Sequence, residues 1–465
     1  MGMKGTTVIE LTDVNTGKVE TYKDENMITN AISDLLSKNI EAMNYTMNGS
    51  TSEWKANVFP LCPNAIGGIL LFSDALDEDA NKYYAPSANP CVGYASNDVN
   101  STADVMRGSL NLTESGKINR GYKFVWDFAT SQANGTISAV ALTHKFGGVG
   151  FYGDEYNNSS KVWSIKNVST TADNRIRTYY VYAVEVNFEE NYFWCIGMNS
   201  SSEIVIRKIR KCFTSVGLNF SLMEEGDELL EEVKLKPTSF VHTSTNNYSQ
   251  YSMHDGKDGY WYGFMNNSNN SGNASMKWIK IKKSDFSFTE GTWTFENARF
   301  YQSGYSYYFD AGPYIYRYSV MLNGYLYVMH YSKTGLYKIN VNNPADITWI
   351  PFGFTSNFSN HTSSYQNGYI YMWTFGDWVC GSDFRVNTND EVVKMTNNAP
   401  FYTTTTPLFQ YGPFLFSFGS YDSRYAKKNL WLLTPYLATI NNLSTSVIKT
   451  ADKTMKITYT ITETE

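Results

Sequence analysis

Two pairs of carboxylates stand close enough in the sequence to be considered for glycoside hydrolysis. They are Asp285 with Glu290, and Asp377 with Asp383. Hydrolysis of a glycosidic bond needs two carboxyl groups roughly 5–10 Å apart, flanking the bound sugar. Both pairs fall on predicted loops, where acidic residues usually face solvent and support turns. We therefore expect no catalytic residue among them.

The five histidines do not form a recognisable metal or catalytic arrangement. They are His144, His242, His254, His330 and His361. None stands in a His-Glu-x-x-His spacing, and His254 and Asp255 are adjacent in sequence but need not face each other. The chain has no Gly-x-Ser-x-Gly elbow and no phosphate-binding glycine loop. The sequence thus predicts no catalytic residue, no metal and no cofactor, and we expect a protein that is not an enzyme.

Aromatic and small polar residues dominate the composition. Aromatic residues make up 16% of the chain, including 36 tyrosines, and charged residues only 18%. An average soluble domain has about 25% charged residues. Tyr and Thr suit pleated sheets, and Asn and Gly suit the tight turns between strands. We therefore expect a mainly all-β fold, and the length of 465 residues indicates two or three domains.

The charge distribution argues against nucleic acids and anionic membranes as partners. The formal net charge is −6, so the whole molecule does not attract polyanions. The basic runs Lys208–Lys211 and Lys280–Lys283 contain apolar residues at alternate positions, which favours exposed strand faces. No segment approaches the roughly 18 apolar residues of a membrane span, or resembles a signal peptide. We expect no nucleic-acid partner and no membrane partner.

The cysteine pattern is not that of a disulfide-rich protein. The five cysteines are Cys62, Cys91, Cys195, Cys212 and Cys380. An odd number without paired spacing fits neither a disulfide framework nor a zinc site. We expect reduced, mostly buried thiols, although Cys62 and Cys91 share one predicted domain and their pairing stays open.

A motif of a turn residue, a glycine and alternating aromatic residues recurs in the second half of the chain. It is found as Asp258-Gly259-Tyr260-Trp261-Tyr262, Asn323-Gly324-Tyr325-Leu326-Tyr327 and Asn367-Gly368-Tyr369-Ile370-Tyr371, and more weakly at 411–416. The glycines at 324, 368 and 412 are 44 residues apart. A strand that alternates basic and apolar residues follows, for example at 276–281 and 336–339.

A period in the forties, made of short alternating strands, indicates the blades of a β-propeller. We predict a kelch-like propeller of about five to six blades over residues 165–420, although the kelch double glycine is missing. Gly259, Gly324 and Gly368 would allow the sharp turns into a strand. The tyrosines of the motif mark the strands: Tyr260, Tyr262, Tyr325, Tyr327, Tyr369 and Tyr371. A β-sandwich with similar strands is the alternative, and the residues that would contact a glycan stay unknown.

Alternating segments at both ends of the chain predict a second, β-rich domain. Residues 6–22 form two strands around Asn15-Thr16-Gly17, which is a hairpin signal. A short helix should follow within 27–36, capped by Asn26 or Thr29.

The remaining strands of this domain come from the middle and the end of the chain. Segments 121–128 and 135–143 predict an antiparallel pair, and 449–462 alternates like a strand that returns to the N-terminal hairpin. We thus expect an N-terminal assembly domain over 1–160, completed by C-terminal strands over 421–465, with the propeller inserted between them.

Three segments together resemble the ends of structural proteins from tailed bacteriophages of Gram-positive bacteria. They are Val8–Glu20 with Asn26–Ala31, then Gly135–His144, and finally Leu437–Leu443 with Lys453–Tyr459. The resemblance covers part of the chain and contains no catalytic signature. It implies a virion protein of the tail, baseplate or tail fibre, made in the host cytoplasm and released by lysis. It also implies contact with other virion proteins and a homo-oligomer.

The leading hypothesis is therefore a non-enzymatic virion structural protein whose propeller recognises a host cell-wall glycan. Tyr, Trp and Asn on propeller loops suit this role, because aromatic rings stack on sugars and amides bond their hydroxyls. One alternative is a phage glycan depolymerase on the same scaffold. Others are a neck- or head-attached fibre or decoration protein, and a cellular carbohydrate-binding propeller.

Overall fold

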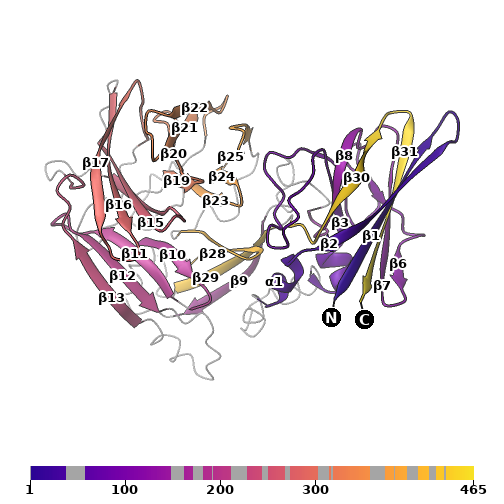
Figure 1. Cartoon of the computed structure of the whole chain (residues 1–465), viewed down its shortest axis with the longest axis horizontal. Coiled ribbons are helices and arrows are strands. Elements are labelled where there is room, and N and C mark those ends of the chain that lie inside the picture. Colours follow the sequence, from indigo (N-terminus) through magenta and orange to yellow (C-terminus); the bar gives the residue numbers. More distant parts are fainter. Residues whose placement is uncertain are drawn as a thin grey trace. The chain divides into compact units, whose positions relative to one another are not determined.

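The computed structural model shows an all-β protein in two compact units. It describes residues 2–37, 58–147, 162–170, 182–190, 192–210, 228–242, 250–267, 273–301, 314–315, 318–356, 372–381, 383–394, 407–417, 426–433 and 436–464. The terminal unit contains Met1–Lys166, Gly412–Leu415 and Trp431–Glu465. The blade unit contains Asn167–Tyr411 and Phe416–Leu430. Figure 1 labels many of the elements of both units.

The terminal unit is a nearly closed barrel built on one sheet. Its main path runs β4-β3-β8-β30-β2-β1-β31-β7-β5, and β6 pairs with β7. The bounds are β1 Met3–Asp13, β2 Val19–Ile28, β3 Gly68–Phe72, β4 Cys91–Ala95, β5 Ser109–Leu110, β6 Gly116–Ile118, β7 Gly121–Phe128, β8 Gly135–Thr143, β30 Thr439–Lys449 and β31 Lys453–Glu463. The helix α1 (Ala31–Ser37) and the helical turn η1 (Leu61–Ala65) complete this unit.

The two ends of the chain meet in this sheet. β31 pairs antiparallel with β1 from Met3 opposite Glu463 to Asp13 opposite Lys453. In Figure 1 the indigo N-terminal strand and the yellow C-terminal strand lie side by side. The predicted return of the C-terminal strand to the N-terminal hairpin is confirmed. Alternate side chains of both strands point inward, and the buried members, such as Ile9 and Ile457, form the core.

The N-terminal hairpin is also confirmed, with Gly17 at a φ of +72° in its turn. The following helix is shorter than predicted, because Met27 and Ile28 extend β2 and pair with β30. The predicted cap Thr29 accepts a hydrogen bond from the backbone N–H of Ala31 at 3.3 Å.

One predicted strand pairing is wrong. Residues 121–128 and 135–143 form strands, but β7 pairs with β31 and β8 pairs with β3 and β30. The reason is that the long C-terminal strands supply partners for both, so the two neighbours in sequence are separated in the sheet.

The blade unit has a propeller-like arrangement of four blades, each a sheet of consecutive strands. The first blade is β10 (Ala183–Asn187), β11 (Tyr192–Met198), β12 (Ile204–Arg210) and β13 (Glu228–Leu235). The second is β14 (Gln250–Asp255), β15 (Tyr260–Asn267), β16 (Asn273–Lys282) and β17 (Phe288–Glu296), with β18 (Tyr314–Ile315) beside β14. The third is β19 (Ser319–Leu322), β20 (Tyr325–Met329), β21 (Gly335–Asn340) and β22 (Ile347–Pro351). The fourth is β23 (Met372–Phe375), β24 (Trp378–Gly381), β25 (Phe384–Val386) and β26 (Val392–Lys394).

The predicted count of five to six blades is therefore wrong. The strands after the fourth blade are β27 (Phe409–Tyr411), β28 (Phe414–Ser417) and β29 (Ala426–Leu433). They form a sheet with β9 (Val162–Thr170), which precedes the first blade in sequence. Because β9 is distant in sequence from the other three strands, this sheet is not a further blade of consecutive strands.

Apolar side chains of neighbouring blades form the core of the blade unit. One buried cluster combines the first and second blades, with Phe193, Tyr251 and Trp261 among its members. Another combines the second, third and fourth blades, with Leu326 and Phe384 among its members. The short strands are thus fixed by packing against the next blade, because a single small sheet is not stable alone.

Candidate functional site

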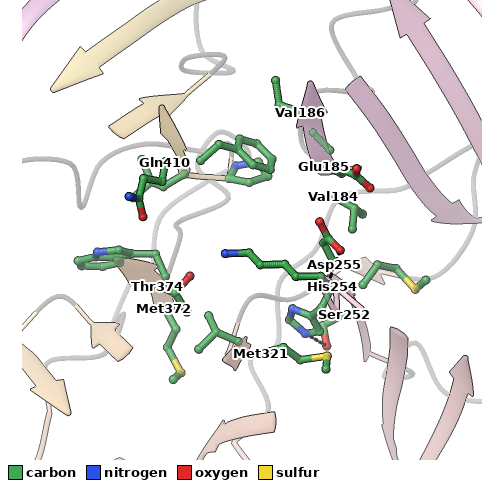
Figure 2. A pocket seen from close by; sticks show the side chains of 18 of the residues that line it. Val184, Glu185, Val186, Ser252, His254, Asp255, Met321, Met372, Thr374 and Gln410 are labelled. Carbon is green, nitrogen blue, oxygen red and sulfur yellow. Dashed lines mark hydrogen bonds between the residues drawn. The ribbon is translucent and has the colours of Figure 1, made fainter. Parts of the chain in front are cut away.

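The first strands of the four blades line a pocket of about 240 Å³. We call it the central pocket. β10, β14, β19 and β23 contribute one side each, and residues 407–410 complete the wall. Figure 2 shows side chains from these strands pointing toward one another across the pocket. Because every blade supplies part of the wall, the stacking of the blades fixes the position of each lining side chain.

Two carboxylates of this wall share one lysine. Lys283 Nζ lies 2.7 Å from Glu185 Oε2 and 2.8 Å from Asp255 Oδ1. Trp261 Nε1 also donates to Glu185 Oε2 at 2.9 Å, and the backbone N–H of Lys257 donates to Asp255 Oδ1 at 2.7 Å. All three charged side chains are between a fifth and a quarter exposed. The carboxylates are thus held in place before any ligand arrives.

The charge of Lys283 is stabilised by this arrangement. Burial disfavours the ammonium form, but the hydrogen bonds to Asp255 and Glu185 outweigh burial and raise the pKa of Lys283 above its usual value. At neutral pH the lysine therefore stays protonated between the two carboxylates.

A histidine and two serines form a hydrogen-bonded triangle in the same wall. His254 Nε2 lies 3.0 Å from Ser252 Oγ and 3.1 Å from Ser319 Oγ, and the two hydroxyl oxygens are 2.9 Å apart. Ser252 and His254 are two positions apart on β14 and so share a face, whereas Ser319 comes from β19. The triangle therefore joins the second blade to the third. A serine beside a histidine can serve as a nucleophile, but both serines are only 2% exposed.

The remaining wall is largely apolar. Met321, Met372, Trp373 and Phe409 line it, and Phe188 stacks on Tyr411 with ring centroids 4.1 Å apart. Apolar and aromatic walls with a few fixed polar groups are typical of small-ligand sites. The central pocket can therefore bind a compact molecule that has both an apolar surface and hydroxyl or amine groups.

The carboxylate pairs considered from the sequence lie outside the central pocket, and Asp285, Glu290 and Asp383 accept hydrogen bonds within the protein. Glu290 accepts hydrogen bonds from the backbone N–H groups of Thr238, Ser239 and Phe240 and from the Thr238 hydroxyl, at 2.7–2.9 Å. Asp285 accepts bonds from Ser287 and Lys282, which lower the pKa of its carboxyl to about 2.

The second pair is likewise placed elsewhere. Ser356 donates to buried Asp383, and neither Asp377 nor Asp383 lines the central pocket. The predicted loop position is confirmed for Asp285, Asp377 and Asp383 but is wrong for Glu290, which lies in β17. The carboxylates that the fold does bring together, Glu185 and Asp255, come from different blades.

The blade markers that the structure describes lie at the turn into the second strand of a blade and on that strand. Gly259 and Gly324, with φ of +90° and +80°, turn the chain from the first strand into the second. Gly368, Tyr369 and Tyr371 lie outside the described residues. In the fourth blade the corresponding turn contains Gly376, at a φ of +53°. The sequence analysis missed Gly376 because no Tyr-x-Tyr follows it.

The tyrosines of the motif face a cation on the third strand in each blade where they are described. Lys280 Nζ lies 4.2 Å from the ring centroid of Tyr260 and 5.1 Å from that of Tyr262. Lys338 lies 4.9 Å and 5.9 Å from the centroids of Tyr325 and Tyr327.

The other two blades repeat this contact. Lys208 lies over Tyr192 and Trp194, and Arg385 lies over Trp378. One basic residue of each third strand thus forms a cation–π contact within its own blade, whereas others, such as Lys277 and Arg207, have different partners.

The histidines and cysteines that the structure describes outside the pocket do not gather into a metal site. Among the described residues, no group of three His, Cys, Asp or Glu side chains could hold a metal ion. Cys62 and Cys91 are both free thiols, and burial raises the pKa of each to about 12. Cys212 and His361 lie outside the described residues. Within the described ranges, no helix has the length and apolar character needed to cross a membrane.

Of the polar residues around the pocket, the sequence singled out His254 beside Asp255, and it indicated Lys283 only as part of a basic run. Glu185, Ser252 and Ser319 were missed. Glu185 is one polar residue in the apolar first strand Ala-Val-Glu-Val, which alone does not mark a pocket residue. No protein-family model matches the sequence, and a comparison with curated proteins finds no significant similarity.

Proposed function

We propose that this chain is a non-enzymatic binding protein that holds a host-surface glycan in the central pocket. The observation that carries the proposal is the pocket itself, which combines a preformed apolar wall with polar groups fixed by the blades. Sugar rings have an apolar face and polar edges, so they match such a lining.

We further propose that the chain is a virion structural protein of a tailed phage, in the tail, baseplate or fibre. The resemblance of Val8–Glu20, Gly135–His144 and Lys453–Tyr459 to phage structural proteins supports this assignment. These three segments all belong to the terminal unit, whereas the central pocket lies wholly in the blade unit. The terminal unit would then serve assembly, and the blade unit would be displayed to the host.

A glycan depolymerase is the second candidate, and one observation favours it. Glu185 Oε2 and Asp255 Oδ1 both bind the Lys283 nitrogen. The separation of these two carboxylate oxygens therefore cannot exceed the sum of the two contact distances. Retaining glycosidases place their carboxyl groups about 5–5.5 Å apart. In those enzymes, however, the sugar lies between the two groups. Here the lysine ammonium group fills that space, which supports binding rather than hydrolysis.

Binding of the purified protein to Gram-positive cell walls tests the proposal. We expect retention on wall polysaccharide, and a loss of about tenfold in affinity for the double variant Thr374→Ala/Gln410→Ala, because both residues line the pocket. Thr348→Ala, an exposed threonine on β22, is the matched control and should bind like the wild type.

A reducing-end assay on the same polysaccharide separates the two candidates. We expect no release of new sugar ends. If the wild type releases new sugar ends and the variant Glu185→Gln does not, the function is hydrolysis and not binding alone.

We also propose that the protein self-associates through the terminal unit. Among the described residues, β2 pairs with β30 only at Met27 and Ile28, so 19–26 present an open strand edge. Open edges can accept a strand from another molecule. Light scattering should give a mass above 52.8 kDa at micromolar concentration. A monomer under these conditions would contradict self-association of the free protein.

Proline substitutions sharpen this test. The N–H groups of adjacent residues in a strand point to opposite edges of that strand. Proline removes one such N–H group. One of the variants Tyr22→Pro and Lys23→Pro should therefore block the open edge, and the other should disturb the pairing with β1. We expect one of these two variants to stay folded by circular dichroism and to become monomeric.

A further inference from the structure

The charged groups around the central pocket are balanced. Glu185, Asp255 and Lys257 line it, and Lys283 bridges the two carboxylates. Among the described residues, these two negative and two positive groups cancel one another's charge. A ligand with a full charge therefore gains little attraction there and loses its hydration on entry.

Among the described residues, each carboxylate uses a single oxygen for its bonds within the protein. Glu185 Oε2 accepts from Trp261 and Lys283, and Asp255 Oδ1 accepts from Lys257 and Lys283. Within the described part of the chain, no hydrogen bond to Glu185 Oε1 or Asp255 Oδ2 is found. Two acceptor oxygens are thus left for the hydroxyl groups of a ligand.

The polar groups lie on opposite sides of the pocket. Figure 2 shows Glu185 and Asp255 on one side and Thr374 and Gln410 on the other, with Met321 between them near the lower edge of the view. This arrangement offers acceptors at one edge of a ring, a hydroxyl and an amide at the opposite edge, and a thioether surface for the apolar face of the ring.

We propose that the central pocket is specific for an uncharged sugar ring, and that anionic or amino-bearing sugars are poor ligands. This inference rests on the proposed glycan-binding function and narrows it to a chemical class. The carboxylates would accept hydrogen bonds from two ring hydroxyls, while Lys283 cancels their charge. The host ligand would accordingly be a neutral wall polysaccharide, and the phosphate-bearing wall polymers would not be bound in the pocket.

Binding of small sugars at low and high salt tests the charge class directly. The probes are neutral glucose, galactose, mannose and N-acetylglucosamine, together with anionic glucuronate and cationic glucosamine, measured by ligand-observed NMR on the full chain. We expect at least one neutral sugar to bind, with less than about twofold change in affinity between the two salt concentrations, because no ionic contact is screened. Glucuronate and glucosamine should bind at least about tenfold more weakly than the best neutral sugar.

Two variants with matched controls locate the effect. Glu185→Gln should weaken the binding of the neutral sugar about tenfold, and Glu190→Gln, on an exposed turn of the same blade, should not. Lys283→Met removes the balancing charge, so glucosamine should gain affinity and its binding should become salt-sensitive. Lys282→Met, the exposed neighbour, should leave glucosamine binding weak.

The outcomes distinguish this inference from the proposed function. If the pocket variants reduce wall binding but glucuronate or glucosamine is the tightest small ligand, the neutral-sugar inference is overturned and the glycan-binding function stands. If neither the small sugars nor wall polysaccharide binds to the folded protein, both are overturned. Salt-insensitive neutral-sugar binding that Lys283→Met converts to salt-sensitive amine binding supports both.

Discussion

The terminal unit and the blade unit build their sheets in opposite ways. In the terminal unit, Ile9, Trp126 and Ile457 lie in one row across three neighbouring strands, although they come from the beginning, the middle and the end of the chain. In the blade unit, each blade is formed by strands that follow one another directly. A sheet whose paired strands are distant in sequence loses more loop-closure entropy before its contacts form. The terminal unit therefore depends on the chain ends, and the blades do not.

Removal of β31 should produce the largest difference between the two units. Deleting 453–465 takes away the strand that pairs with both β1 and β7. We expect the amide protection of Ile9 and Trp126 in hydrogen exchange to be lost, while that of Ile279 and Leu326 persists. Loss of protection in both units at once would show that the two units unfold together, and it would contradict their independent stability.

Two matched core substitutions should each destabilise one unit only. Ile457 and Leu326 are fully buried aliphatic residues, one in each unit. Ile457→Ala and Leu326→Ala should each cost about 2–5 kcal/mol in the free energy of unfolding. Thermal unfolding should show the loss of stability, and hydrogen exchange should show that amide protection decreases only in the unit that carries the substitution. An equal loss of protection in the other unit would contradict the separation.

The carboxylate of Glu290 should make the blade unit sensitive to acid. Burial raises the pKa of Glu290, but the N–H groups of Thr238, Ser239 and Phe240 outweigh burial and hold it below its usual value. A carboxyl pKa that is lower in the folded state gives stability above the unfolded pKa, and this stability is lost as the pH falls through the folded pKa. Glu290→Ala should cost about 2 kcal/mol at neutral pH.

Measurement of the unfolding free energy of both proteins against pH checks this prediction. The difference between wild type and Glu290→Ala should shrink as the pH falls below about 4. Glu190→Ala, an exposed carboxylate of the first blade, should change stability little at any pH. A difference that grows on acidification would contradict the assignment.

The cation–π contacts should give the smallest effects. Lys280 lies over two tyrosines, whereas Lys338 lies over two tyrosines and also forms a 2.7 Å ion pair with Asp390. Lys280→Met should cost about 0.5–1 kcal/mol. Lys338→Met should cost somewhat more, because Asp390 then loses its partner. Chemical denaturation of both variants decides the order, and a larger loss for Lys280→Met would contradict it.

The sequence predicted local features well and distant pairings unevenly. The hairpin around Gly17 and the turns at Gly259 and Gly324 depend on residues within a few positions, so their patterns could be recognised directly. The alternation of the C-terminal strand also predicted its pairing with the N-terminal hairpin. The partners of β7 and β8 could not be predicted, because both strands alternate in the same way and any long strand would satisfy them.

The central pocket could not be predicted for a related reason. Glu185, Asp255 and Lys283 belong to different parts of the chain, and only the stacking of two blades brings them within hydrogen-bond distance. Their sequence neighbourhoods resemble any other strand with one polar residue. By contrast, Asp285 and Glu290 stand close in sequence and serve unrelated turns. The spacing of the repeat also suggested more blades than the four that form.

A crystal structure of the protein with a wall-derived neutral oligosaccharide tests glycan binding in the central pocket most directly. We expect an intact glycan with one sugar ring in the central pocket, its hydroxyl groups bound to Glu185 and Asp255, and Lys283 still between the two carboxylates. An oligosaccharide bound only outside this pocket, or a cleaved one within it, would contradict the proposed binding function.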